Sequence, residues 1–189
     1  MIIRGGVGIA WGAALVLLLA NSAEAQVPAG VGEGWLGEFD HAARQLTQLA
    51  EAIPPEKYGW RPAPGVRSVS EVYMHIALAN YILLGRAGVS TSFDVSKLGK
   101  EPDKAITGKA EVVKLLKQSF DAVRASYPKA DRRKRVQAFG KDVTAEDVFT
   151  RILVHNHEHM GQLIAYARVN GVVPPWSRSG DTGAPDASD

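Results

Sequence analysis

Four stretches of the chain repeat apolar residues at three- and four-residue steps, the spacing that gathers them on one face of an α-helix. The first places Trp35, Phe39 and Leu46 on one stripe, for example. No segment alternates apolar and polar residues over enough positions to predict a strand. The four stretches are residues 34–53, 68–88, 109–127 and 144–170. Because each helix must bury its stripe against another, the sequence predicts an all-α fold, a four-helix bundle with one long connection at 89–106.

The ends of these helices carry recognised start and stop signals. Ser68 with Glu71, and Thr144 with Asp147, match the capping box that opens a helix. Prolines follow the first and third stretches and a glycine follows the fourth. These residues end helices, so they support the four boundaries.

The segment 1–25 has the organisation of a signal peptide. Arg4 gives a positive start, the apolar run VGIAWGAALVLLLA follows, and AEA precedes Gln26 as a cleavage site. The run is shorter than the about 20 residues of a membrane-spanning helix, although a retained N-terminal anchor is the alternative. The sequence therefore predicts a protein exported to the periplasm or secreted, cleaved near Ala25/Gln26 and without a stable membrane anchor.

The rest of the chain has room for one domain. We expect a flexible N-terminus at 26–33, the bundle at 34–176, and a disordered tail at 177–189, where the residues are polar with glycine and proline. The chain has no cysteine, which excludes disulfides, thiol nucleophiles, thiolate metal ligands and a lipid anchor at the signal. An exported domain of this length must then be held by its apolar core.

The charge of the chain does not indicate nucleic-acid binding. The net charge is +2, and Arg4 and Glu24 cancel within the predicted signal peptide, which leaves the remainder near neutral. One local run, DRRKR at 131–135, is basic. It can contact phosphate or lipid headgroups, or it is a solvated loop between helices, which is the commoner case. Neither a reading motif nor a basic face with aromatic residues is visible, so we expect no nucleic-acid partner.

Histidines interrupt two of the apolar stripes. His155 and His159 are one turn apart on the fourth helix, so both face the core, whereas His157 lies about 200° around the axis from His155. His75 occupies an apolar position of the second helix, and His41 falls off the stripe of the first. Facing stripes meet in a bundle, which lets His75 approach the pair on the fourth helix.

Histidines four residues apart can chelate one ion at about 2.0–2.1 Å from each nitrogen, and a third histidine makes a three-ligand site. Such a site keeps a position for water or substrate, as catalytic rather than structural metal sites do. The alternative is a set of core histidines bonded to one another or to water. The segment HEHMG has no second histidine four residues after His157, so Glu158 is not assigned as the base of a zincin and is expected on the helix flank.

The residues around these histidines resemble those of the DinB-like superfamily (DinB/YfiT-like metalloproteins). The matching segments are PPEKYGWRPAPGVRSVSEVYMHIA at 54–77 and HNHEHMGQLIAYARVNGVVPP at 155–175, and the resemblance extends over the expected bundle. It implies an up-and-down four-helix bundle with a divalent metal ion bound by His75, His155 and His159.

Members of this superfamily bind zinc or nickel, often form homodimers, and include thiol-dependent transferases and isomerases. The resemblance therefore implies a zinc or nickel cofactor and a homodimer. The signal peptide departs from the better-understood members. Because low-molecular-weight thiols belong mainly to the cytosol, export argues against thiol transfer and favours zinc, although affinity order alone does not decide the metal.

Two functions fit this pattern. The first is a metal-dependent hydrolase or group transferase for a small-molecule substrate, in which the ion lowers the pKa of a bound water or polarises a substrate atom. Gln162 and Tyr166 can orient that substrate, but the pattern assigns no catalytic residue. The second is a non-catalytic metal-binding bundle that serves stability, sensing, sequestration or a stress response. Trp60, Tyr73 and Trp176 are candidates for lining a pocket, although such residues more often pack in the core.

Overall fold

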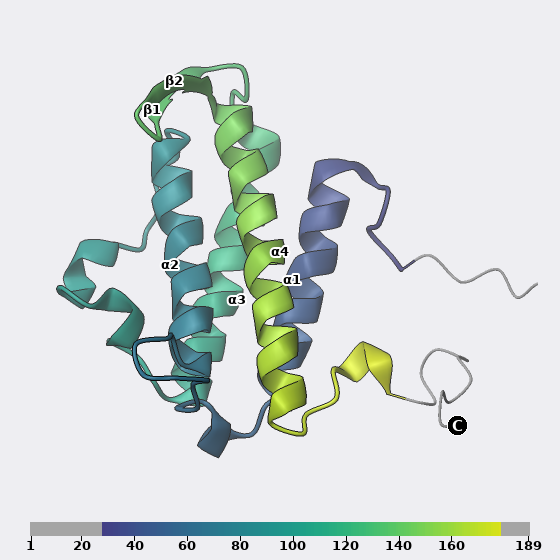
Figure 1. Cartoon of the computed structure of the whole chain (residues 1–189). Helices are drawn as coiled ribbons and strands as arrows, with labels where there is room; N and C mark the ends of the chain where they lie inside the picture. The colour runs from purple at the N-terminus through teal and green to yellow at the C-terminus, as the bar shows by residue number, and fades with distance from the viewer. Residues whose placement is uncertain (1–27, 179–189) are drawn as a thin grey trace, which may run out of the picture.

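The computed structural model describes residues 28–178. Four long helices make up most of this part of the chain: α1 (Gly34–Ala52), α2 (Val69–Arg86), α3 (Lys109–Ser126) and α4 (Ala145–Val169) (Figure 1). Their bounds agree with the predicted stretches to about two residues, the uncertainty that helix ends carry. The predicted all-α four-helix bundle is therefore confirmed. The predicted signal peptide at 1–25 and most of the predicted tail, from 179 on, lie outside the described residues.

Within the bundle, α2 packs against both α3 and α4, and α1 closes the other side against the same two helices (Figure 1). Aromatic rings fill the space at one end of α1. Trp35 stacks on Phe39 and Tyr127 with ring centroids 5.3 and 3.9 Å apart, and Phe149 meets Trp35 edge-on at 5.7 Å. Burying side chains of this size stabilises the fold by about 1.5–3 kcal/mol each. The predicted stripe of α1 is thus the part of the core that holds α1 in place.

One stripe residue is placed wrongly by the sequence pattern. Ile82 falls on the three- and four-residue apolar spacing of the second stretch, which predicts a buried side chain, but it is 42% exposed. The connection 89–106 covers a different side of the helix, where Phe93 stacks on Tyr81 with ring centroids 4.7 Å apart. Tyr81 and Leu84 are buried instead. The buried face of α2 is therefore wider than one stripe, and it is turned towards the connection.

The connection between α2 and α3 contains two short 3-10 helices, η2 (Val95–Leu98) and η3 (Pro102–Lys104). It lies beside α2 in Figure 1, and η3 packs directly against that helix. The sequence predicts the connection but not these turns. Their effect is to bring Asp103, on η3, next to His75 of α2.

The prediction that the chain contains no strand is wrong. β1 (Arg135–Ala138) and β2 (Lys141–Thr144) pair antiparallel over four residue pairs just before α4 (Figure 1). Strands this short cannot display a clear alternation, so periodicity misses them. Their two-residue loop, Phe139–Gly140, has φ of 56° and 70°, as in a type I′ hairpin turn. The basic run is therefore partly strand rather than a simple loop.

The segments at both ends of the described chain lie against the bundle. Residues 28–33 form turns, closed by hydrogen bonds from the Val31 and Glu33 amides to the carbonyls of Pro28 and Gly30. At the other end, η5 (Pro175–Ser177) contacts α1. Among residues 28–178, none of the helices combines the length and the apolarity needed to span a bilayer.

Candidate metal centre

The three histidines of the predicted site meet in the structure. His75 of α2 and His155 and His159 of α4 have ring centroids 4.5 to 5.0 Å apart. One nitrogen of each lies within 4.8 Å of the others, and Nε2 of His75 is 3.1 Å from Nε2 of His155. His157 does not join them, because its Nδ1 lies 2.9 Å from the Leu153 carbonyl oxygen of its own helix. The predicted convergence of the three rings is confirmed.

Local sequence determines where the two helices that carry these rings begin. At the start of α2, the Ser68 hydroxyl accepts from the Glu71 amide at 3.3 Å, and the Glu71 carboxylate accepts from the Ser68 amide at 2.8 Å. Thr144 and Asp147 form the same capping box at the start of α4. Both predicted boxes are thus confirmed. By fixing the first turn of each helix, they determine which side chains face the neighbouring helix.

A buried polar bridge holds α4 in place beside α2 and α3. Asn156, the residue after His155, donates from Nδ2 to Oδ1 of Asn80 at 3.2 Å, and Asn80 donates from Nδ2 to the Ser119 hydroxyl at 3.1 Å. All three side chains are fully buried. A buried polar group left without a partner costs about 1–3 kcal/mol, so sliding α4 along α2 would be unfavourable. The bridge therefore keeps His155 opposite α2.

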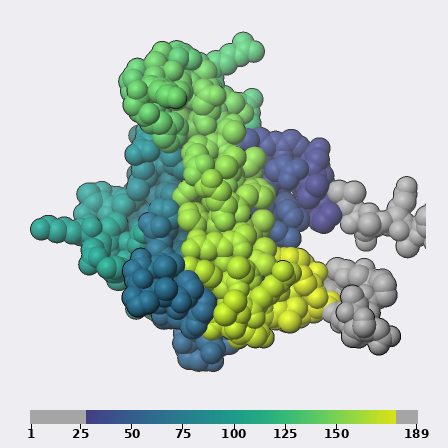
Figure 2. Space-filling model, viewed as in Figure 1, coloured from purple at the N-terminus to yellow at the C-terminus, as the bar shows by residue number. Residues whose placement is uncertain are grey.

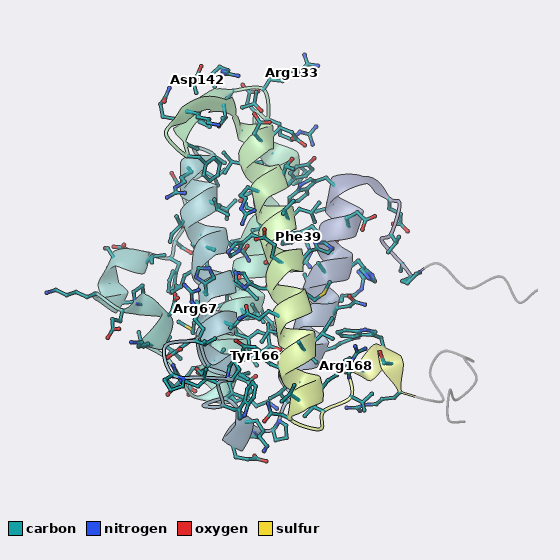
Figure 3. The ribbon with its side chains drawn as sticks, viewed as in Figure 1. Phe39, Arg67, Arg133, Asp142, Tyr166 and Arg168 are labelled. Atoms are coloured by element: carbon teal, nitrogen blue, oxygen red, sulfur yellow. The ribbon has the colours of Figure 1, made fainter. Side chains whose placement is uncertain are left out.

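A chain of hydrogen bonds determines the tautomer of His159. The Arg67 carbonyl can only accept, so the Tyr166 hydroxyl donates to it, at 3.3 Å. The Tyr166 oxygen then accepts from Nε2 of Gln162 at 2.9 Å, which turns Oε1 of Gln162 towards Nδ1 of His159 at 2.8 Å. Figure 3 labels Arg67 and Tyr166, which lie together at the lower half of α2 and α4. His159 consequently donates from Nδ1 and keeps its lone pair on Nε2.

Asp103 has the same effect on His75. Its Oδ2 lies 3.4 Å from Nδ1 of His75 and accepts from Nε of Arg67 at 2.8 Å. Burial acts to raise the pKa of Asp103, but the hydrogen bonds with His75 and Arg67 outweigh it, so the pKa is lowered from its usual value. The ionised carboxylate can only accept. His75 therefore directs a protonated Nδ1 towards Asp103 and leaves the lone pair on Nε2.

His155 is the most buried of the three rings and is held neutral. Its side chain lies at the interface of α2 and α4, and the residue is 8% exposed. Burial, followed by the neighbouring His159 and His75, lowers the pKa of His155 to about 4. Burial also lowers the pKa of His159. Neutral imidazole is the form that binds metal, so these shifts favour ligation.

The donor set fits a divalent metal ion. Two nitrogens bound at about 2.0–2.1 Å to one tetrahedral zinc are about 3.3 Å apart, close to the 3.1 Å between Nε2 of His75 and Nε2 of His155. His75 and His159 both direct Nδ1 to an outer acceptor, as metal-bound histidines do. Nδ1 of His155 is buried and has no hydrogen-bond partner among the described residues. Nε2 of His75 and Nε2 of His155 face each other, and two lone pairs at this distance would repel. Either a metal ion bound by both atoms or a proton between them must offset that repulsion.

An open cleft of about 700 Å³ adjoins the cluster. Asp103 and Gln162, which contact the histidines, line it together with Arg67. The aromatic candidates are elsewhere. Trp60 packs edge-on against Tyr166 with ring centroids 5.2 Å apart. Tyr73 is fully buried in the core, and Trp176 packs against the core from outside. All three aromatic side chains therefore serve packing and do not line this cleft.

Glu158 is on the flank of α4, as the sequence predicts. Its carboxylate is exposed and forms an ion pair with Arg151, whose Nη2 lies 2.6 Å from Oε2. Its hydrogen-bonding partner is therefore Arg151 rather than one of the three histidines. Gln162 orients His159, and Tyr166 orients Gln162, while the expectation that both residues orient a substrate stays a prediction.

Asp103 and Arg67 are the contacts that sequence reasoning missed. Asp103 belongs to the weakly periodic connection, and Arg67 precedes the cap of α2. A carboxylate within reach of a core histidine is a recognised companion of metal ligands. Nothing in the spacing of Asp103 along the chain, however, reveals which histidine it meets.

The fold and the cluster together define the class of protein: a four-helix bundle with three histidines gathered between its second and fourth long helices. The family model of the DinB superfamily matches residues 38–163, a range that includes all three histidines. The chain belongs to the DinB superfamily. Among curated proteins, none matches the chain.

Solved structures with the same fold are similar to this chain at low sequence identity. A DinB-like protein from Bacillus cereus ATCC 10987 is 19% identical, with a TM-score of 0.63, covering 76% of this chain and 95% of that one. A DinB-like protein from Bacillus subtilis is 20% identical, with a TM-score of 0.56 and coverage of 72% and 91%. A putative DinB family member from Exiguobacterium sibiricum 255-15 is 23% identical, with a TM-score of 0.56 and coverage of 73% and 93%. These likenesses support the fold.

Proposed function

We propose that the protein binds one divalent metal ion through His75, His155 and His159, with zinc as the metal and nickel as the alternative. The observation that carries this proposal is the orientation of the rings. Asp103 and Gln162 accept from the protonated Nδ1 atoms of His75 and His159, which leaves both Nε2 lone pairs free to ligate. Three imidazoles with an open position are the ligand set of catalytic zinc sites, and imidazole also suits nickel.

With this site, the protein would act as a metal-dependent hydrolase or group transferase. A bound ion supplies Lewis acidity to a substrate atom or to water. The side chains of this protein supply position and charge: Asp103 and Gln162 hold the rings, and Arg67 presents a guanidinium at the cleft where a substrate would lie. No general base is assigned, because Glu158 is paired with Arg151 outside the cluster.

Export is part of the same proposal. The segment 1–25 has the pattern of a signal peptide, which supports a location in the periplasm or outside the cell. Zinc and a small-molecule substrate other than a cytosolic thiol suit that location. A homodimer stays a prediction from the family resemblance.

The catalytic proposal is tested with the zinc-loaded protein on a panel of ester, amide and thiol-transfer substrates. We expect turnover of at least one class, lost in His75→Ala and kept in His157→Ala, whose ring lies outside the cluster. If the fully loaded protein turns over none of them, the catalytic proposal fails and the non-catalytic metal-binding bundle takes its place. In that case a chelator should still lower the Tm, because binding that favours the native state stabilises it.

We expect Asp103→Asn to weaken zinc binding by about 10- to 100-fold, the usual effect of removing an outer partner of a metal-bound histidine. The variant loses the charge that orients Nδ1 of His75 and pairs with Arg67. A competition titration against a chromophoric chelator measures the change. Asp94→Asn is the matched control, because Asp94 lies on the same connection and its carboxylate accepts hydrogen bonds from Ser96. Equal zinc affinity in the two variants would show that Asp103 does not support the ligand.

A further inference from the structure

The end of the bundle that carries the β-hairpin combines two unusual features, a strained aromatic residue and a group of cations. We define the hairpin end as residues 131–142 together with Arg86 at the end of α2. We propose that the hairpin end docks reversibly on membrane surfaces that contain anionic phospholipid. The proposal is independent of the metal centre.

Phe139 is held in a conformation that its side chain disfavours. Its φ of 56° is in the left-handed region, where a bulky L-residue is a rare outlier and where glycine or asparagine is usual. The fold does not need the ring for its core, since Phe139 is 47% exposed. The guanidinium carbon of Arg86 lies 5.5 Å from the ring centroid. An exposed aromatic ring kept at the cost of backbone strain indicates a contact with something outside the chain.

Cations gather on the hairpin end, and several have no carboxylate to neutralise them. Arg132 pairs with Glu146, and Arg135 pairs with Asp142. Within residues 28–178, by contrast, Arg86, Arg133, Lys134 and Lys141 have no carboxylate oxygen within 4.0 Å, and all four are exposed. The hairpin end therefore keeps a positive surplus although the whole chain is close to neutral.

The shape of this region favours a membrane over the other polyanions. The hairpin caps one end of the bundle as a convex surface, shown in green at the top of Figure 2, and Arg133 reaches outward from it in Figure 3. Single-stranded nucleic acid is bound in grooves by several aromatic platforms, whereas this surface offers one ring. An aromatic ring flanked by cations suits a headgroup layer, where the ring enters the interface and the cations meet lipid phosphate.

Docking through the hairpin end would leave the candidate metal centre accessible. Arg67 and Tyr166, which border that centre, are labelled in the lower half of Figure 3, away from Arg133 and Asp142. His75 and Arg86 are on the same helix, about 16 Å apart at 1.5 Å per residue. A membrane-bound protein could thus present its cleft to the surrounding solution.

The test is co-sedimentation of the full chain with vesicles of phosphatidylcholine alone or of phosphatidylcholine mixed with a minor share of phosphatidylglycerol. Binding is read as the difference between the two lipid mixtures, which cancels any contribution common to both. We expect binding that depends on phosphatidylglycerol and weakens with salt. Arg133→Gln with Lys134→Gln should weaken it by about 25-fold, since each cation near an anionic surface contributes about fivefold. Lys114→Gln with Arg168→Gln, which removes the same charge from exposed positions elsewhere, should leave it unchanged.

Phe139→Asn gives a second, independent measurement. Asparagine tolerates the left-handed conformation, so this variant should not lower the Tm, yet it should lose most of the vesicle binding. A merely structural role for Phe139 would lower the Tm and leave binding intact. The proposal is overturned if phosphatidylglycerol has no effect, if the two double variants bind alike, or if the protein prefers a single-stranded oligonucleotide to the vesicles.

Discussion

Replacing His75 by alanine is expected to remove nearly all bound metal from the protein. The wild-type chain should hold about one ion after purification without a nickel resin. The variant keeps His155 and His159 but loses the ligand that α2 supplies, and two neutral imidazoles alone bind a divalent ion weakly. The loss should exceed the about 10- to 100-fold that removal of an outer partner causes. Elemental analysis of the dialysed proteins, together with the chain concentration, measures the stoichiometry.

The matched control for this experiment is His157→Ala. His157 lies on the same helix, between the two ligands, but its Nδ1 faces the Leu153 carbonyl oxygen. It should keep about one ion per chain and show that removing a histidine is not enough to lose the metal. If His75→Ala keeps one ion per chain and has a native circular dichroism spectrum, then the three rings do not bind a common metal ion.

The parts of this site that can be predicted are those that rest on local sequence. Two capping boxes and an apolar period locate α2 and α4, and an interrupted stripe marks His75 as a core residue. The facing of two stripes then follows from the bundle, so the convergence of the three histidines is predictable without a structure. The register between α2 and α4 brings the histidines together because a buried hydrogen-bonded bridge through Asn80 holds it. The sequence pattern does not predict this bridge.

The parts that could not be predicted depend on contacts between distant segments with no period of their own. Asp103 reaches His75 only because the connection folds back on α2, where it covers Tyr81 and not Ile82. The position of Gln162 on the helix is visible in the sequence, but its role depends on the Arg67 carbonyl, whose position is set by the loop before α2. The hairpin was missed because its strands are too short for alternation to be visible.

Stability of the metal-free protein should fall steeply as the pH drops from 6.5 towards 4. The pKa of His155 is about 4 in the folded chain, because of burial and then of its histidine neighbours, and about 6.5 in an unfolded one. Between these values the unfolded chain takes up a proton that the folded chain does not, so the free energy of unfolding decreases as the pH falls. The difference corresponds to about 3 kcal/mol for His155, and the lowered pKa of His159 acts in the same direction.

Urea unfolding in EDTA at several pH values from 7.5 to 4.5 measures this effect. The lowered pKa values of Asp103 and Glu71 act from the ordinary carboxylate range downwards, so histidines dominate all but the acid end of this window. His155→Gln keeps a polar side chain of similar size but cannot titrate, and it should flatten most of the curve, whereas His157→Gln should leave the slope unchanged. A loss of about 3 kcal/mol is a large share of the about 5–15 kcal/mol that stabilises a typical domain. If wild-type stability is the same at both ends of the range, then His155 is not a buried neutral imidazole, and the electrostatic reason for metal binding is removed with it.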